Sequence, residues 1–119
     1  MKLIIAGGRT YNLTVYDYVR LDRIRGVTEV VSGGAKGADT CGELWAQATK
    51  IPVKRFVADW DGFGKKAGML RNRQMAEYAD AVVLFPGGRG TDNMFETAKE
   101  LGLRIFDLRD SGDLLSTCL

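Results

Sequence analysis

The segment around residues 86–91 constrains the fold most, because it joins a predicted strand to a predicted helix through a glycine-rich turn. Residues 81–85 form an apolar run rich in β-branched side chains, and residues 92–101 carry apolar side chains at helical spacing. In this arrangement the free N–H groups of the turn and the positive end of the helix dipole point to one place, which favours an anion. Thr91 is the predicted N-cap of the helix.

The same alternation of strand, short turn and helix runs along the chain of 119 residues. It demands a mostly parallel sheet with helices on both faces. The predicted fold class is α/β, a Rossmann-like three-layer α/β/α arrangement with a five-stranded parallel sheet in the order 3-2-1-4-5. The predicted strands are residues 2–6, 28–31, 53–57, 81–85 and 104–108, and the predicted helices are 13–25 (capped by Asn12), from the second glycine turn to about 50, 68–79 and 92–101.

Length and composition indicate one domain. We predict a single Rossmann-like nucleotide-binding domain over residues 1–109 and a C-terminal tail over residues 110–119, either a short helix or loose. No run of about 18 apolar residues is present, and the N-terminus lacks the pattern of a signal peptide. The protein is therefore expected to be cytoplasmic, without a membrane partner.

Several classes of chemistry are disfavoured by residues that the chain lacks. It contains no histidine, which argues against a Ser-His-Asp triad and a His-ligated metal site, and its two cysteines indicate no disulfide framework. Neither the G-x-G-x-x-G fingerprint nor the Walker A pattern is present, which disfavours a dehydrogenase or P-loop enzyme. We expect no metal and no cofactor. The net charge of +2 does not by itself indicate broad nucleic-acid binding.

The predicted strand order brings three glycine-rich turns to one edge of the sheet, beside the point where the order reverses. Cationic and carboxylate side chains gather there, a combination that suits a nucleotide, with phosphate on amides and guanidinium groups and ribose hydroxyls on a carboxylate. Trp60 either stacks on a base or anchors a lid. The predicted ligand-binding residues are Gly7, Gly8, Arg9, Ser32, Gly33, Gly34, Lys36, Gly37, Asp39, Trp60, Lys65, Arg71, Asn72, Pro86, Gly87, Gly88, Arg89, Gly90 and Thr91.

Four segments, residues 31–39, 58–60, 68–76 and 85–91, together resemble the YspA-related family. This family is a Rossmann-like branch of the superfamily that joins the SMF/DNA-processing proteins to the Lonely Guy phosphoribohydrolases. The resemblance extends over about residues 2–107. It implies a nucleotide-related ligand, and it also implies a homodimer, because relatives often pair through helices near the site.

Lonely Guy enzymes release a base from a nucleoside 5′-monophosphate with a PGGxGTxxE motif and an arginine on the preceding helix. The resemblance assigns the phosphate loop to residues 87–91 and the arginine to Arg71, but Met94 occupies the position of the catalytic glutamate. A thioether cannot stabilise an oxocarbenium ion, so enzymatic activity stays open. The candidate catalytic residues are Arg71, Asp39 and Asp92.

Three functions remain at this point: nucleotide binding, nucleotide N-glycosidase activity, and binding of single-stranded DNA by the cationic side chains with Trp60 as a stacking platform. The position of Arg71 requires an explanation, because the positive charge of an arginine near a helix N-terminus is unfavourable with respect to the helix dipole. It either forms a salt bridge with Asp59 or Asp61, or it contacts a ligand phosphate.

Overall fold

Five parallel strands form one sheet in the order β3-β2-β1-β4-β5, as the sequence predicts. The computed structural model describes residues 1–109. The predicted C-terminal tail, residues 110–119, lies outside the described residues. The strands are β1 (Lys2–Ala6), β2 (Glu29–Ser32), β3 (Val53–Arg55), β4 (Ala81–Leu84) and β5 (Arg104–Asp107).

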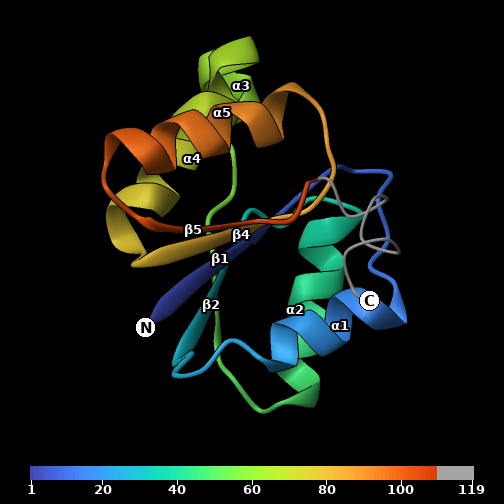
Figure 1. Cartoon of the computed structure of the whole chain (residues 1–119). Coiled ribbons are helices and arrows are strands. Elements are labelled where there is room, and N and C mark those ends of the chain that lie inside the picture. Colours follow the sequence, from blue (N-terminus) through green and yellow to red (C-terminus); the bar gives the residue numbers. More distant parts are fainter. Residues whose placement is uncertain (110–119) are drawn as a thin grey trace.

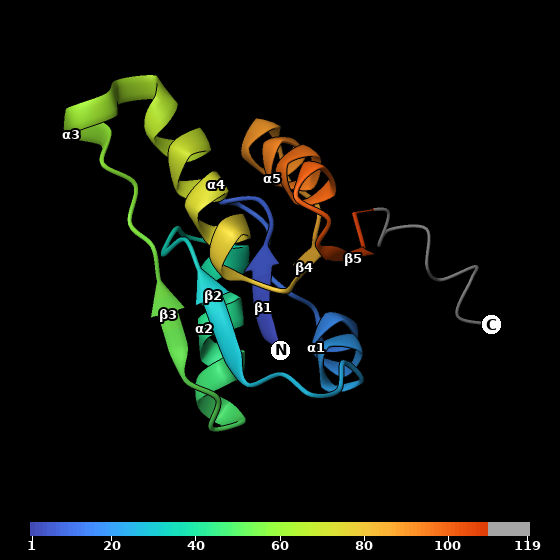
Figure 2. The same cartoon turned by 90° about the vertical axis from the view of Figure 1, so that its left-hand side faces the viewer.

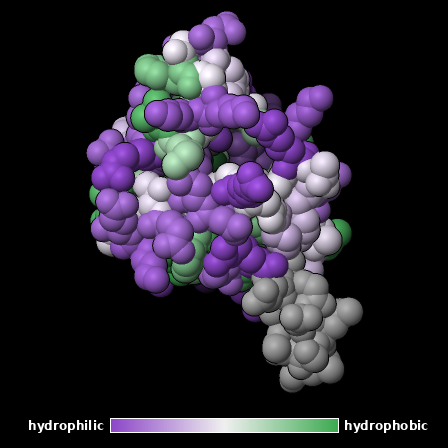
Figure 3. All heavy atoms as spheres, turned by 90° about the horizontal axis from the view of Figure 1, so that it is seen from above, coloured by the Kyte–Doolittle hydropathy of each residue, from purple (hydrophilic) through white to green (hydrophobic). Residues whose placement is uncertain are grey.

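Helices cover both faces of the sheet and complete the three predicted layers (Figure 1). One face carries α1 (Val15–Asp22) and α2 (Ala38–Ala48), and the other carries α4 (Ala67–Tyr78) and α5 (Arg89–Glu100). The view from above, over α4 and α5, is largely hydrophilic with a few small apolar patches (Figure 3). No helix within residues 1–109 is long and apolar enough to cross a membrane.

The two central strands carry the core. Every residue of β4 is buried, as expected for a parallel strand packed on both faces. Along β1 the side chains alternate: Leu3 and Ile5 belong to the cluster that includes Leu21 and Trp45, and Ile4 belongs to the cluster that includes Met94. The sheet is therefore held by one apolar cluster on each face.

The first helix is shorter than residues 13–25, the predicted range. It begins at Val15 because Thr14 is its N-cap, and the prediction that Asn12 caps it is wrong. The hydroxyl of Thr14 accepts from the backbone N–H of Asp17 at 3.1 Å, and the Asp17 carboxylate accepts from the N–H of Thr14 at 3.0 Å. This reciprocal capping box sets the start of the helix.

Residues 58–67 lie between the predicted strand 53–57 and the predicted helix 68–79, where the sequence favours a loop, but they are partly helical. They contain α3 (Trp60–Phe63) and a 3₁₀ turn over Gly64–Lys66 that leads into α4. The carboxylate of Asp59 accepts from the N–H of Gly62 at 2.9 Å and so caps the short helix. In Figure 2, α3 lies beyond the carboxyl end of β3, so this segment borders the edge at which the glycine turns meet. Other predicted boundaries differ by one to three residues, the usual uncertainty at element ends.

We predict that Gly37→Ala destabilises the fold by about 2–4 kcal/mol. Gly37 has φ +74°, and a Cβ there would lie 2.3 Å from the carbonyl oxygen of Gly8 and 2.5 Å from that of Arg9. Chemical denaturation measures the loss. Gly90→Ala is the matched control, because Gly90 is helical and a Cβ there meets nothing within 4 Å. Equal losses in the two variants would contradict the close-approach argument.

Candidate functional site

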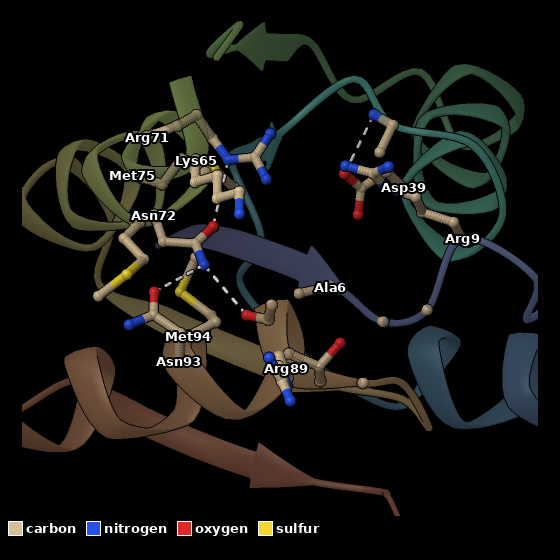
Figure 4. A pocket seen from close by; sticks show the side chains of 18 of the residues that line it. Ala6, Arg9, Asp39, Lys65, Arg71, Asn72, Met75, Arg89, Asn93 and Met94 are labelled. Carbon is tan, nitrogen blue, oxygen red and sulfur yellow. Dashed lines mark hydrogen bonds between the residues drawn. The ribbon is translucent and has the colours of Figure 1, made fainter. Parts of the chain in front are cut away.

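A cavity of about 660 Å³ opens beyond the carboxyl end of β1, where the strand order reverses between β1 and β4 (Figure 4). Its walls come from the turn after β1, the start of α2, the segment from α3 through α4, and the first half of α5. The volume lies within the range of about 300–1,000 Å³ that is typical of small-molecule sites. The position is the one at which open α/β sheets bind ligands.

The amino terminus of α5 forms one wall of the cavity. The helix begins at Arg89 with Gly88 as the N-cap, so the predicted N-cap Thr91 instead lies in the first turn. The first N–H groups of a helix have no intrahelical partner, and here they belong to residues that line the cavity. A Cβ on Gly88 or Gly90 would meet nothing within 4 Å, so the backbone stays open to a ligand.

Arg71 and Asn72 tie α4 to the turns on both sides of the cavity. Arg71 donates from Nη1 to the carbonyl oxygen of Gly33 at 2.9 Å and from Nε to Oδ1 of Asn72 at 3.1 Å. Asn72 donates from Nδ2 to the carbonyl oxygen of Gly90 and to Oδ1 of Asn93, both at 3.0 Å (Figure 4). The side chain of Asn72 is thereby oriented by three partners, and it holds the start of α5 in place.

Neither carboxylate that was considered as a salt-bridge partner for Arg71 pairs with it. Within residues 1–109, Asp59 and Asp61 form no ion pair with this guanidinium group, which lines the cavity instead. Burial lowers the pKa of Arg71; nearby Asp39 opposes this shift and Arg9 adds to it. The salt-bridge alternative is therefore wrong, and the contact with a ligand phosphate stays a prediction.

Asp39 supplies the only carboxylate that lines the cavity in the described chain. Its side chain is buried, and Oδ2 accepts from the N–H of Ala35 at 3.2 Å. Burial raises the pKa of Asp39 to about 6, against the hydrogen bond from Ala35 and the positive charges of Arg71 and Arg9. A carboxyl group with this pKa can change its protonation state near neutral pH.

Most of the predicted ligand-binding residues come together in the cavity. The lining contains backbone from three turns, three arginines, a lysine and the indole of Trp60. The ring of Trp60 lies 5.7 Å from the guanidinium carbon of Arg9 and is 48% exposed. Twelve predicted residues line the cavity: Gly7, Gly8, Arg9, Asp39, Trp60, Lys65, Arg71, Asn72, Gly88, Arg89, Gly90 and Thr91.

The remaining predicted ligand-binding residues lie outside the cavity lining, where several serve the packing of the turns. Ser32 donates to Glu43 at 2.6 Å and accepts from the N–H of Gly34 at 3.0 Å. A Cβ on Gly87 would lie 2.1 Å from the hydroxyl of Thr91. The predicted residues outside the lining are Ser32, Gly33, Gly34, Lys36, Gly37, Pro86 and Gly87.

Asp92, a candidate catalytic residue, also lies outside the cavity lining. Its side chain is 67% exposed and pairs with Arg109 at 3.1 Å. On a helix, residue 92 is turned away from the face that carries Gly90, Asn93 and Met94. The carboxylate of Asp92 is therefore not part of the cavity wall.

Several lining residues were not predicted, and helical spacing could have identified some of them. Asn93 and Met94 follow Gly90 by three and four residues, and Met75 follows Arg71 by four, so each pair shares a helix face. Met94 is 1% exposed, so it forms an apolar part of the wall where the resemblance places a glutamate. The residues missed as lining are Ala6, Ala35, Gly68, Met69, Met75, Asn93 and Met94.

The described side chains suggest no metal centre. Within residues 1–109, no group of three or more His, Cys, Asp or Glu side chains is arranged to hold a metal ion. The site is instead composed of arginine, lysine and amide donors around a single carboxylate.

We predict that Asp39→Asn stabilises the protein more at about pH 7.5 than at about pH 4.5. The folded state raises the pKa of Asp39 from 3.8 to about 6. Ionisation of Asp39 therefore lowers the stability of the wild type as the pH rises from about 4.5 to about 7.5, by about 2 kcal/mol at 1.36 kcal/mol per pKa unit. Thermal unfolding of wild type and variant at both pH values measures the difference.

Asp61→Asn is the control, because Asp61 is exposed and has no ion-pair partner within the described residues. Its effect on the melting temperature should be the same at both pH values. A pH-independent effect of Asp39→Asn would contradict the raised pKa.

The chain is similar in fold to two solved structures. One is DNA processing protein A (DprA) from Streptococcus pneumoniae, which superposes with a TM-score of 0.71 and 18% sequence identity. The superposition covers 89% of this chain and 49% of the DprA chain, so this chain spans about half the length of DprA. TM1055, a target of the Northeast Structural Genomics Consortium, superposes with a TM-score of 0.64 and 19% identity over 87% of this chain and 71% of TM1055. Both likenesses support the Rossmann-like fold.

Sequence comparison identifies relatives directly. The Gene 61 protein of Mycobacterium phage D29 is 34% identical over 121 residues, which cover 92% of this chain and 97% of the phage protein. The family model of the YspA, cpYpsA-related SLOG family matches residues 1–63, more than half of the chain. The range matched by the family model contains two of the four segments that carry the resemblance, residues 31–39 and 58–60. The chain belongs to the YspA, cpYpsA-related SLOG family.

Proposed function

We propose that the protein binds a nucleotide or a nucleotide-derived molecule in this cavity, with a phosphate group on the amino terminus of α5. The observation that carries the proposal is the open backbone of Gly88 and Gly90 beside unpaired N–H groups at the start of a twelve-residue helix. Such a helix end favours an anion by its free donors and its dipole together.

The charges around the cavity support an anionic ligand. Arg9, Arg71 and Arg89 line it together with Lys65, against the single carboxylate of Asp39. Arg71 comes from α4 and Arg89 from α5, so guanidinium groups approach the cavity from two helices (Figure 4). Guanidinium groups bind phosphate through paired, charge-assisted hydrogen bonds.

Two further side chains suit the other parts of a nucleotide. The half-exposed ring of Trp60 offers a stacking surface for a base, since a base and an indole pack face to face. The carboxylate of Asp39 has acceptor capacity beyond its one hydrogen bond from Ala35, and ribose hydroxyls are suitable donors.

The comparisons support the proposal at a general level. The chain belongs to a SLOG family, and DprA, to which it is similar in fold, is named for DNA processing. Nucleotides and nucleic acids share the phosphate group for which the cavity is suited.

We expect at least one nucleotide from a panel of mono-, di- and cyclic nucleotides to raise the melting temperature. At a ligand concentration of about 100 Kd the stabilisation is about 2.7 kcal/mol. Arg89→Ala should weaken binding about tenfold or more, the worth of a hydrogen bond to a charged group, with an unchanged melting temperature of the free protein. Arg89 is exposed and has no hydrogen-bond or ion-pair partner within residues 1–109, so its removal leaves the fold intact.

Arg73→Ala is the matched control. Arg73 belongs to α4 but pairs with Glu77 and Glu100 outside the cavity lining, so nucleotide affinity should not change. No stabilisation by any nucleotide would contradict the proposal. Tight binding of a single-stranded oligonucleotide without any mononucleotide binding would favour the DNA-binding alternative, and that binding should fall steeply with salt.

Nucleotide N-glycosidase activity is the second candidate, favoured by Asp39. Its pKa of about 6 suits a general acid or base near neutral pH, and it faces the cavity with Arg71. This function predicts hydrolysis of a nucleoside 5′-monophosphate to free base and ribose 5-phosphate, and loss of this hydrolysis in Asp39→Asn. Chromatography of incubated nucleoside monophosphates tests it, and unchanged nucleotides across the panel would exclude it.

We also propose a homodimer, as the resemblance implies. Phe63 and Met69, each 57% exposed, and Leu70, 41% exposed, supply apolar surface on α3 and α4 beside the cavity. Light scattering of the purified protein gives the mass in solution, and a monomeric mass would contradict this assignment.

A further inference from the structure

A second cavity, of about 340 Å³, lies between the end of α1 and the edge strand β5. It shares no lining residue with the nucleotide cavity. Its apolar lining includes Ile24, Phe106 and Leu108, which pack against the core cluster on the α1 side of the sheet. The edge strand and the short helix α1 thus leave a hollow whose interior is apolar.

Four arginines surround this hollow: Arg20, Arg23, Arg25 and Arg104. No aspartate or glutamate lines it in the described chain. Arg20 pairs with the buried carboxylate of Asp17, and its guanidinium carbon lies 4.9 Å from the ring centroid of Tyr16. The lining is therefore strongly positive, and among its four arginines only Arg20 has a carboxylate partner within the described residues.

The other three arginines have no carboxylate partner within residues 1–109. Arg104 lies over the ring of Phe106, at 4.8 Å, and so joins the apolar lining to the charged rim. Asp22 is adjacent in sequence to Arg23, but its carboxylate accepts from the indole N–H of Trp45 at 2.8 Å. The rim thus offers guanidinium groups that are available to a ligand.

The buried guanidinium group of Arg20 is a second, independent indication of a ligand, because two of its nitrogens lack a hydrogen-bond acceptor within the described residues. Its side chain is 12% exposed, and its Nε and Nη1 atoms are buried without a hydrogen-bond partner. No other buried side-chain nitrogen or oxygen in the described chain lacks one. A buried donor without an acceptor destabilises the folded state, and more so when the donor is charged. Within residues 1–109 no group accepts from these two nitrogens, so a bound anion would supply an acceptor that the described chain lacks.

We propose that this cavity binds a small phosphorylated molecule with an apolar group. A phosphoryl group carries close to two negative charges and three acceptor oxygens, which several guanidinium groups can engage at once. The apolar group would contact Ile24, Phe106 and Leu108, as in small-molecule sites that combine an apolar wall with a few oriented polar groups. This site is separate from the nucleotide cavity and does not rest on the proposed nucleotide function.

Titration of the ¹⁵N-labelled chain of residues 1–119 with phenyl phosphate tests the proposal. We expect saturable shifts of the Ile24, Phe106 and Leu108 amide signals, with a Kd of about 1 mM or lower. Inorganic phosphate should bind more weakly because it lacks the apolar group, and benzyl alcohol should bind more weakly because it lacks the charge. Shifts confined to the amides of residues 88–91 would place the probe in the nucleotide cavity and overturn the proposal.

Arg104→Gln removes one guanidinium group from the rim, and it should raise the Kd for phenyl phosphate about tenfold at the second cavity. Arg104 is exposed, so the folded spectrum should persist. Arg73→Gln, an exposed arginine outside both cavities, is the control and should leave the Kd unchanged. Chemical shifts that rise linearly, without saturation, up to about 10 mM phenyl phosphate would overturn the proposal. Equal affinity for phenyl phosphate and inorganic phosphate would also overturn it, and so would tighter binding of an oligonucleotide at the same amides.

Discussion

Three backbone hydrogen bonds of Gly8 hold together the edge of the sheet at which the cavity lies. The N–H of Gly8 donates to the carbonyl oxygen of Pro86 at 2.8 Å, and its carbonyl oxygen accepts from the N–H groups of Tyr11 and Ala38, both at 3.2 Å. One peptide segment thereby joins the turns that follow β1, β2 and β4. The turns approach each other so closely that a Cβ on Gly37 would overlap the carbonyl oxygen of Gly8. The close packing of backbone against backbone is therefore the first reason that these turns are rich in glycine.

This packing divides the glycines by role. Gly37 and Gly87 allow backbone segments to meet, whereas Gly88 and Gly90 face open space at the start of α5. The cost of the site appears elsewhere, in the burial of Asp39, whose raised pKa means that its ionised form is disfavoured in the folded state. The hydrogen bond from Ala35 and the charges of Arg71 and Arg9 offset only part of this burial effect.

The strand order and the place of the cavity follow from alternating apolar runs and short turns, because parallel strands with right-handed crossovers leave few arrangements. The start of α1 was missed although the Thr14–Asp17 capping box is visible in the sequence, since Asn12 is an equally acceptable cap by type. The helical character of residues 60–66 was missed because glycine and charge in that segment favour a loop.

The sequence by itself determined the α/β class, the glycine turns at one edge and the gathering of positive charge there, because these depend on periodicity and on local turn chemistry. Only the tertiary structure decided which of the predicted residues line the cavity and which lie outside it. It turned Asp92 outward to Arg109, set Asn72 between Gly90 and Asn93, and placed Met94 in the wall. It also brought Arg20 and Arg104 together around a second hollow. The physical reason is that helix rotation and loop contacts are set by the packing of distant segments, about which local sequence carries no information.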